Sequence, residues 1–312
     1  MSNAALNIPT RKAYGLKLAE LGETNPNIVV LDSDLSCSTQ THIFAKKFPE
    51  RFINNGVAEQ DMMGTAAGLA QSGKTVFTST FTIFATGRAW EIVRQSICYP
   101  NFNVKICSTH AGITVGEDGA SHQSIEDITL MRVIPNMKVL VPADAHQTSE
   151  MVAFLAKDNG PAFLRLGRAK TDDVFTSDYK FQLGKGDVLS EGSDICLFTT
   201  GFVTKATLDA AAQLKEKGIS ASVVNLGSIK PIDESLIVEM AQKHKMLFSV
   251  EEHSVIGGFG AAISEVLTSK FPQKLIRLGL QDVFGQSGTH PELLKHYKLD
   301  AQGITESVLA EL

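Results

Sequence analysis

The feature that most constrains the fold is a regular exchange of short apolar runs with longer segments of helical spacing. In the first half of the chain, apolar runs predict strands at 28–31, 75–78, 104–108, 138–141 and 162–166. Segments with helical spacing predict helices at 12–21, 59–71, 84–98, 125–132 and 146–156. Compact apolar runs are typical of buried parallel strands. Their alternation with helices indicates a largely parallel sheet covered by helices.

The same alternation returns in the second half of the chain after a polar interruption. Strands are predicted at 195–199, 221–225, 246–250 and 274–278, with helices at 205–217, 234–243 and 261–268. The fold class is therefore α/β, with two consecutive domains that each contain a mostly parallel sheet flanked by helices. The predicted limits are residues 1–170 for the first domain, 171–193 for an extended connection and 194–312 for the second domain.

Charge and cysteine content exclude several classes of protein. The 312 residues carry a net charge of −5 without a basic or acidic block, so no nucleic-acid or membrane-surface partner is expected. No apolar run approaches membrane-spanning length, and the N-terminus lacks the pattern of a secretion signal. The four scattered cysteines are predicted to be small core residues of a cytoplasmic protein.

One glutamate, Glu59, is placed where it could handle protons. It follows the short strand-like run 51–53 and begins a segment rich in Gly and Ala, 59–71. The positive end of a helix dipole favours a charged carboxylate, whereas burial favours a neutral one. A carboxyl group under both influences can donate or accept a proton. The alternative is an ordinary glutamate in the first turn of a helix.

The segment 108–123, between a predicted strand and a predicted helix, contains two histidines, one aspartate, one glutamate and three glycines. His110 and His122 can bind hydroxyl groups or transfer protons near neutral pH. Glycines allow positive φ and a close approach of the backbone to a ligand, and they stand at Gly112, Gly116 and Gly119. A metal site is a weaker alternative because the two histidines do not have a specific ligand spacing. Solvated loop side chains are the other alternative.

Phe81 and Phe84 stand three residues apart at the turn between a strand and a helix. Ordinary core packing would explain an isolated pair of this kind. Here the pair lies between Glu59 and the histidine-rich segment, which favours a common pocket. The glycines of the second half, Gly201 and 257–260, do not form a dinucleotide-binding pattern.

Together these motifs resemble the C-terminal half of the transketolase family of thiamin diphosphate enzymes. Five stretches carry the resemblance in order: GVAEQ, STFTIF, STHAGITVGEDGASHQSIED, VLVPAD and FLRLGR. Residues 11–168 resemble the pyrimidine-binding domain of the family and residues 194–312 its C-terminal domain. Deoxyxylulose-phosphate synthases differ by an Arg in place of His110 and a shorter loop. The β subunits of 2-oxo acid dehydrogenases resemble this loop poorly.

The resemblance implies roles toward the cofactor. Glu59 matches the catalytic glutamate that bonds N1′ of the aminopyrimidine, and Phe81 and Phe84 match aromatic residues around that ring. Asp34 occupies the place of an aspartate near the cofactor, in Ser-Asp-Leu rather than Ala-Asp-Leu. Gly87 is a larger departure, because many transketolases carry an aromatic residue there.

The resemblance also implies roles toward a phosphorylated sugar. His110, Asp118 and His122 match residues that hold the sugar hydroxyls, and both histidines assist proton transfer. Arg168, with Arg165 nearby, matches the arginine that binds the substrate phosphate, for which a guanidinium is well suited.

One motif of the family is missing, namely the GDG segment and the Asn that bind the diphosphate and Mg²⁺. The expectation is therefore a subunit without a metal site of its own. It would share thiamin diphosphate with a separate N-terminal subunit that binds Mg²⁺, in an α₂β₂ assembly with a homodimer contact through the pyrimidine-binding domain. A split deoxyxylulose-phosphate synthase and a non-catalytic homologue stay open as alternatives.

Overall fold

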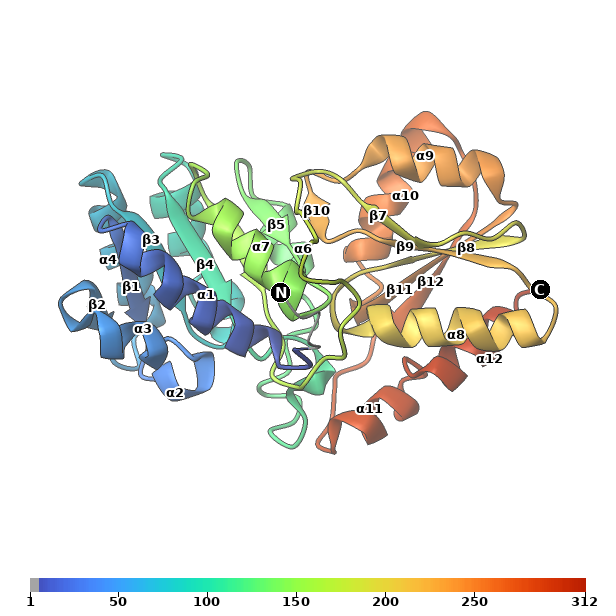
Figure 1. Cartoon of the computed structure of the whole chain (residues 1–312), viewed down its shortest axis with the longest axis horizontal. Helices are drawn as coiled ribbons and strands as arrows, with labels where there is room; N and C mark the ends of the chain where they lie inside the picture. Colours follow the sequence, from blue (N-terminus) through green and yellow to red (C-terminus); the bar gives the residue numbers. More distant parts are fainter. Residues whose placement is uncertain (1–5) are drawn as a thin grey trace. The chain divides into compact units, whose positions relative to one another are not determined.

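The computed structural model describes residues 6–312 and divides the chain into two compact units (Figure 1). The first unit contains the chain up to Ala111 and then Leu130–Phe181, and the second contains Gly112–Thr129 and Gln182–Leu312. The segment 112–129, which the sequence predicts within the first domain, thus groups with the second unit. Among residues 6–312, no helix combines the length and the apolarity needed to cross a bilayer.

In the first unit, parallel strands follow one another in the order β5-β6-β4-β3-β1-β2. The strands are β1 (Ile28–Asp32), β2 (Phe52–Asn54), β3 (Thr75–Ser79), β4 (Val104–Ser108), β5 (Lys138–Leu140) and β6 (Ala162–Arg165). Strands β1 and β4 are buried along their whole length, which explains their continuous apolar character. Because the strands are parallel, the segments that follow them emerge at the same edge of the sheet.

Helices cover the strands of the first unit. They are α1 (Thr10–Thr24), α2 (Ser36–Thr39), α3 (His42–Lys47), α4 (Glu59–Gln71), α5 (Trp90–Ile92), α6 (Asp127–Arg132), where the chain returns from the second unit, and α7 (Ala145–Leu155). Helices α1 and α7 pack side by side, and α4 packs on β3 (Figure 1). Glu59 therefore begins a helix, as the sequence predicts.

The helix predicted over 84–98 is not continuous. Two π-helical turns, Phe84–Arg88 and Val93–Cys98, flank the short α5. A π turn accommodates an additional residue, so it changes which side chains share a face. A pattern read with a period of 3.6 residues cannot reveal such an insertion.

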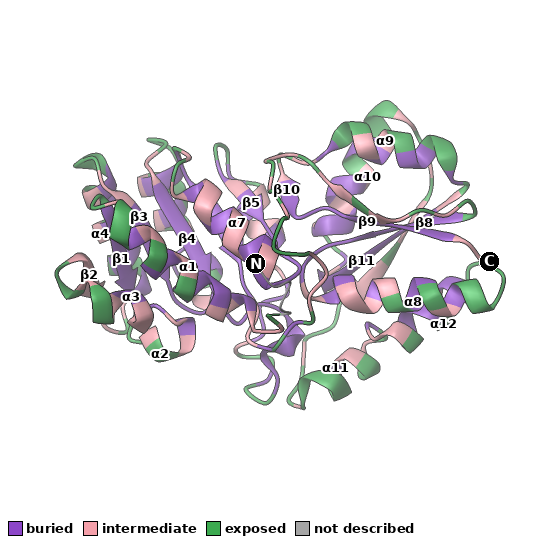
Figure 2. Cartoon of the chain, in the orientation of Figure 1, coloured by how far each residue is buried: buried purple, intermediate pink, exposed green. Residues whose placement is uncertain are grey.

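The second unit is built on a sheet with the strand order β12-β11-β8-β9-β7. Neighbouring strands in this sheet run parallel, except that β7 pairs antiparallel with β9. The strands of this unit are β7 (Asp187–Ser190), β8 (Ile195–Thr199), β9 (Ala221–Asn225), β10 (Ser228–Lys230), β11 (Met246–Ser254) and β12 (Leu275–Leu280). Figure 2 shows the central strands β8, β9 and β11 buried almost throughout.

Two pairs of helices cover this second sheet. The paired helices are α8 (Thr204–Glu216), α9 (Glu234–Lys243), α10 (Phe259–Lys270) and α12 (Ala301–Leu309), and α11 (His290–His296) precedes α12 in the chain. Helix α8 packs with α12 on one face, and α9 packs with α10 on the other (Figure 1). Each unit is thus a mostly parallel sheet flanked by helices, and the predicted fold class is confirmed.

Two sequence-based expectations need correction. Strand β7 lies within 171–193, which was expected to be an extended connection; its bonding to β9 makes it an edge strand of the second sheet. The cysteines are not all core residues, because Cys37 is exposed whereas Cys98, Cys107 and Cys196 are buried. The predicted limits at residues 170 and 194 stay a prediction.

One buried cation in the first unit gives a testable pH dependence. The Lys105 side chain is fully buried in β4, and its Nζ donates to the carbonyl oxygen of Gly160 over 2.6 Å. Burial lowers the pKa of Lys105 to about 8, although Asp158, 3.5 Å away, opposes this shift. The folded protein therefore binds fewer protons than the unfolded chain between this pKa and the ordinary value near 10.5.

We expect this lysine to make the folded state more stable as the pH rises from about 8 to about 10.5, by roughly 3 kcal/mol at most. Urea unfolding of the wild type and of Lys105→Met across this range measures the effect. The variant should lack this part of the pH slope, while Asp158 keeps Lys138 as a partner at 2.8 Å. Identical slopes for the two proteins would contradict the assignment.

Candidate active site

The first candidate, Glu59, is buried at the start of α4 and is paired with an arginine. Its side chain is only 2% exposed, whereas the Arg88 side chain is 50% exposed. Arg88 Nη1 donates to Glu59 Oε2 over 2.8 Å. The carboxylate also lies at the helix end where the dipole is positive, which favours negative charge. Glu59 is therefore more than a solvated glutamate of a first helical turn.

Two main-chain hydrogen bonds join the ends of β3 and β4. Thr109 N donates to Thr80 O over 3.1 Å, and Thr82 N donates to Thr109 O over 2.8 Å. These bonds hold Phe81 beside His110, and their rings stack with centroids 3.8 Å apart. The histidine-rich segment and the aromatic pair thus meet in the structure, as predicted from their order in the sequence.

The aromatic pair connects His110 to Glu59. Phe81 and Phe84 are stacked, with ring centroids 6.0 Å apart and an interplanar angle of 12°. The Arg88 Cζ atom lies 4.7 Å from the centroid of the Phe84 ring. A carboxylate, a guanidinium, two phenyl rings and an imidazole therefore form one continuous cluster in the first unit.

The imidazole of His110 is held in a specific orientation. Thr109 Oγ1 and His110 Nδ1 are 2.8 Å apart, and His110 is 3% exposed. Its φ of 60° is unusual for a residue other than glycine. Local strain of this kind is common at functional sites and persists only when the surroundings hold it.

A second group of predicted residues carries positive charge. Arg165 is buried at the end of β6, and Arg168 is half-buried three residues later. The bond from Gly167 N to Thr10 Oγ1, 2.8 Å, ties this segment to the start of α1. Burial lowers the pKa of Arg11, and the nearby charge of Arg168 lowers it further. Two guanidinium groups whose positive charges act on each other in this way are suited to an anion.

Two hydrogen bonds join Asp34 to Asn54 and not to the other predicted site residues. The backbone of Asp34 is in the left-handed region, with a φ of 61°, two residues after the end of β1. The side chain is exposed and accepts a hydrogen bond of 3.2 Å from Asn54 Nδ2. Asp34 thus lies at the sheet edge predicted for it, and its place at a cofactor stays a prediction.

The other predicted sugar-binding residues, Asp118 and His122, belong to the second unit, whereas His110 belongs to the first. Asp118 is exposed, and His122 Nδ1 lies 3.0 Å from Ser121 Oγ. The glycines of the loop have positive φ as predicted, with values of 76° at Gly112, 89° at Gly116 and 74° at Gly119.

A buried carboxylate from a distant strand holds this loop. Glu252, on β11 and 3% exposed, accepts a hydrogen bond of 2.6 Å from Thr114 N. A Cβ atom at Gly112 would lie 2.3 Å from Glu252 Oε1. Gln123 adds a second tie, because its Nε2 donates to the carbonyl oxygen of Gln286 over 2.9 Å. The sequence alone offers no signal for the role of Glu252, which is 138 residues away from Thr114.

Replacing Gly112 by Ala should destabilise the protein more than the same change at Gly218. Both positions have positive φ, which costs an alanine roughly 1 kcal/mol. Only Gly112 also has a neighbour in contact distance of the added atom; Gly218 has open space. The clash with Glu252 should bring the total to about 3 kcal/mol. Urea unfolding measures both changes, and equal losses would contradict the tight contact.

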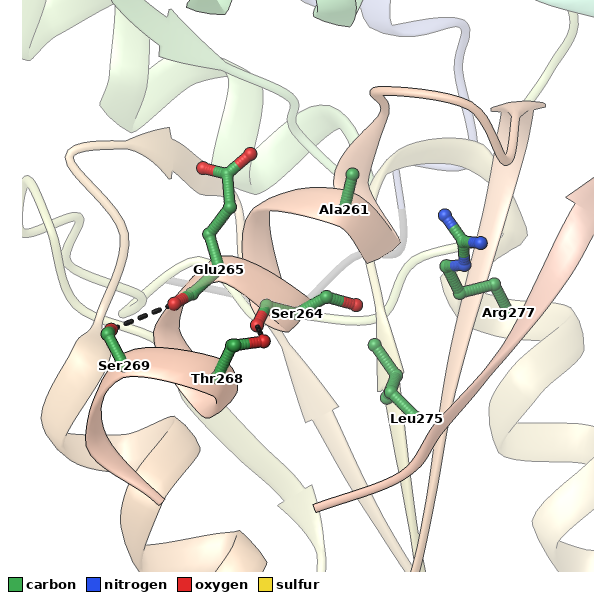
Figure 3. Close-up of a pocket in the computed structure, with 7 residues that line it drawn as sticks. All are labelled: Ala261, Ser264, Glu265, Thr268, Ser269, Leu275 and Arg277. Atoms are coloured by element: carbon green, nitrogen blue, oxygen red, sulfur yellow. Dashed lines mark hydrogen bonds between the residues drawn. The ribbon is translucent and has the colours of Figure 1, made fainter. Parts of the chain in front are cut away.

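A shallow pocket of about 650 Å³ lies elsewhere on the second unit, between α10 and β12 (Figure 3). Seven residues line it: Ala261, Ser264, Glu265, Thr268, Ser269, Leu275 and Arg277. The three hydroxyl groups donate to carbonyl oxygens of their own helix, and Arg277 Nη1 donates to Val255 O. None of the predicted site residues lines this pocket.

Neither Arg88 nor Arg11 carries a signal in the sequence that points to the site. Arg88 stands 29 residues after Glu59, and a π-helical turn determines its direction. Arg11 reads as an ordinary charged residue at the start of a helix. Only the fold reveals the neighbours of both arginines.

Known proteins resemble this chain along nearly all of its length. Residues 7–173 match the family "Transketolase, pyrimidine binding domain", and residues 184–304 match "Transketolase, C-terminal domain". A solved structure described as "Split gene transketolase, inactive beta4 tetramer" is 50% identical, with a TM-score of 0.89. The match covers 97% of this chain and 98% of that chain.

Two curated relatives carry different substrate names. One of them, a subunit of the apulose-4-phosphate transketolase of Phocaeicola vulgatus, is 37% identical over 303 residues, covering 97% of each protein. The 6-deoxy-6-sulfo-D-fructose transketolase subunit SqwH of Clostridium sp. is 37% identical over 297 residues. That match covers 95% of this chain and 92% of the relative.

Proposed function

Because the chain belongs to the transketolase family, with both its pyrimidine-binding and its C-terminal domain, we propose that it is the C-terminal subunit of a split transketolase. It transfers a two-carbon ketol unit between phosphorylated sugars. The observation that carries the proposal is the continuous cluster of Glu59, Phe84, Phe81 and His110 in the first unit. The donor and acceptor sugars are not determined by this cluster.

The cluster fits the aminopyrimidine half of thiamin diphosphate. A flat heterocycle matches the stacked rings of Phe81 and Phe84, and its ring nitrogen matches a buried carboxylate. When bound, thiamin diphosphate supplies the electron sink for cleaving and forming the carbon–carbon bond. The partner subunit would hold the diphosphate and Mg²⁺, since the sequence lacks the family motif for both.

The predicted site residues of this chain each have a part in the proposed reaction. The carboxylate of Glu59 accepts a proton from the pyrimidine nitrogen or returns it there. The imidazole of His110, held by Thr109 and by the Phe81 ring, takes up or returns the proton of a sugar hydroxyl. We propose the same substrate contact for His122 and Asp118.

The positive charges at Arg168 and Arg11 hold the sugar phosphate in this proposal, with Arg165 three residues before Arg168 in the sequence. Guanidinium groups bind phosphate oxygens with paired, charge-assisted hydrogen bonds. Burial is the larger cause of the lowered pKa of Arg11, and repulsion between the two arginines in the free protein lowers this pKa further. An anion between them removes this repulsion, so the pair favours substrates that carry a phosphate.

A separate N-terminal subunit completes the enzyme in this proposal. The relative from Phocaeicola vulgatus is named as one subunit of a transketolase, and the 50% identical structure is described as an inactive β₄ tetramer. Co-expression with an N-terminal subunit, followed by ketol-transfer assays across phosphorylated and sulfonated sugars, tests the proposal. Turnover should appear only in the complex. Robust ketol transfer by this chain alone would refute the proposal that a separate N-terminal subunit completes the enzyme.

The exposed face of α4 is the proposed contact between subunits. Gly64 and Gly68 are exposed one turn apart, and a Cβ at either position would meet no atom within 4 Å. Replacing Gly64 by Leu should therefore leave the fold of the chain intact, yet weaken assembly by about 10²-fold. Sedimentation velocity measures the assembly, with Ala212→Leu on the exposed side of α8 as the control. Unchanged assembly in the Gly64 variant would place the contact elsewhere.

A further inference from the structure

We propose that Arg88 acts as a latch on the catalytic carboxylate: its guanidinium and the aminopyrimidine ring are alternative partners of Glu59 and Phe84. The inference rests on the proposed function, since it concerns the same site. When the cofactor binds, the N–H donor at the Glu59 carboxylate would change from the guanidinium of Arg88 to the aminopyrimidine ring. Arg88 would thus set the affinity of the site for the cofactor.

The contacts of Arg88 are those that the cofactor ring needs. Its Nη1 donates to Glu59 Oε2 over 2.8 Å, and its Cζ lies 4.7 Å from the centroid of Phe84. A guanidinium is flat, carries N–H donors in its plane and stacks on aromatic rings. An aminopyrimidine that is protonated at its ring nitrogen is also flat and also donates an N–H. In this proposal both groups lie over the Phe84 ring beside the Glu59 carboxylate, and this space admits only one of them at a time.

The two partners of the ion pair differ in their freedom to move. Glu59 is 2% exposed and begins a helix, so the carboxylate stays where it is. Half of the Arg88 side chain faces solvent, and a Cβ on the preceding Gly87 would meet no atom within 4 Å. The backbone of Arg88 is held by Gln60, whose Nε2 donates to the Arg88 carbonyl oxygen over 3.3 Å. The guanidinium can therefore swing into water while its backbone stays in place.

The latch also explains how a buried carboxylate is kept stable before the cofactor arrives. A buried charge without a partner is strongly unfavourable. Arg88 supplies the counter-charge, and the ring nitrogen of the cofactor takes its place on binding. Removing the guanidinium should consequently destabilise the cofactor-free protein and make cofactor binding more favourable.

Calorimetric titration of thiamin diphosphate, with Mg²⁺, into the complex with the N-terminal subunit tests this inference. Arg88→Ala should bind the cofactor about tenfold more tightly than the wild type, because no ion pair has to be broken. Arg88→Gln, which keeps the stem and an N–H donor but loses the charge, should bind with intermediate affinity. Arg94→Ala changes an exposed arginine nearby and serves as the control.

A second measurement uses this chain without partner and cofactor. Arg88→Ala should lower its urea midpoint, whereas Arg94→Ala should not. Unchanged cofactor affinity in both Arg88 variants would overturn the latch and show that Arg88 has no effect on binding. Weaker affinity in both would also overturn it and would make Arg88 a ligand of the cofactor. A wild-type complex that does not bind thiamin diphosphate would instead refute the proposed function itself.

Discussion

Replacing Glu59 by Gln is expected to lower kcat of the reconstituted enzyme by about 10³-fold, the loss typical of removing a positioned proton carrier. Glutamine keeps the size of the side chain and can still accept a hydrogen bond from Arg88. It cannot exchange a proton with the pyrimidine nitrogen. The effect should therefore appear in kcat, with little change in the KM of the sugars.

The matched control for this variant is Asp61→Asn in the same helical turn. Asp61 is exposed, and its carboxylate accepts a hydrogen bond of 3.0 Å from Asn55 Nδ2. Asp61→Asn also removes one negative charge, two residues after Glu59 in the same helix. It therefore shows how much activity is lost simply because the start of the helix has one negative charge fewer. Activity in Glu59→Gln equal to that of the control would remove Glu59 from the mechanism.

Replacing Arg168 by Ala should lower kcat/KM for phosphorylated sugars by about 10²-fold, which corresponds to a charge-assisted hydrogen bond. Arg11→Ala should have an effect of the same kind, because burial and the charge of Arg168 both act on this group. The loss should be much smaller for the same sugars without phosphate. Steady-state kinetics with matched phosphorylated and unphosphorylated substrates measures this difference.

Lys170→Ala is the control for the two arginine variants, since Lys170 is an exposed cation two residues after Arg168. It should leave kcat/KM nearly unchanged, because an exposed ammonium contributes little to a bound phosphate. An equal loss for substrates with and without phosphate would show that Arg168 supports the fold or another step. That result would contradict the phosphate assignment.

The fold was predictable from the sequence wherever a periodic pattern determined it. Strands such as β1, β4 and β8 are buried along both faces and therefore read as apolar runs. Strand β7 escaped prediction because it is a short edge strand, only partly buried, in a polar stretch rich in glycine. The π-helical turns escaped because they break the period on which helix prediction depends.

The site was predictable only as far as single residues indicate their chemistry. Glu59, His110 and the phenylalanine pair stand at the ends of strands or the start of a helix, where a parallel sheet gathers ligand-binding residues. Arg88 and Glu252 carry no such signal. Their importance comes from partners that are 29 and 138 residues away, which only the folded chain brings close.

In the proposed enzyme, this chain holds the pyrimidine half of a cofactor site that a separate subunit completes. Equilibrium binding of thiamin diphosphate, in the presence of Mg²⁺, tests it most directly when this chain, the N-terminal subunit and their mixture are compared. Binding should be tight in the mixture and at least about 10²-fold weaker for either subunit alone. Equally tight binding by this chain without its partner would contradict the claim.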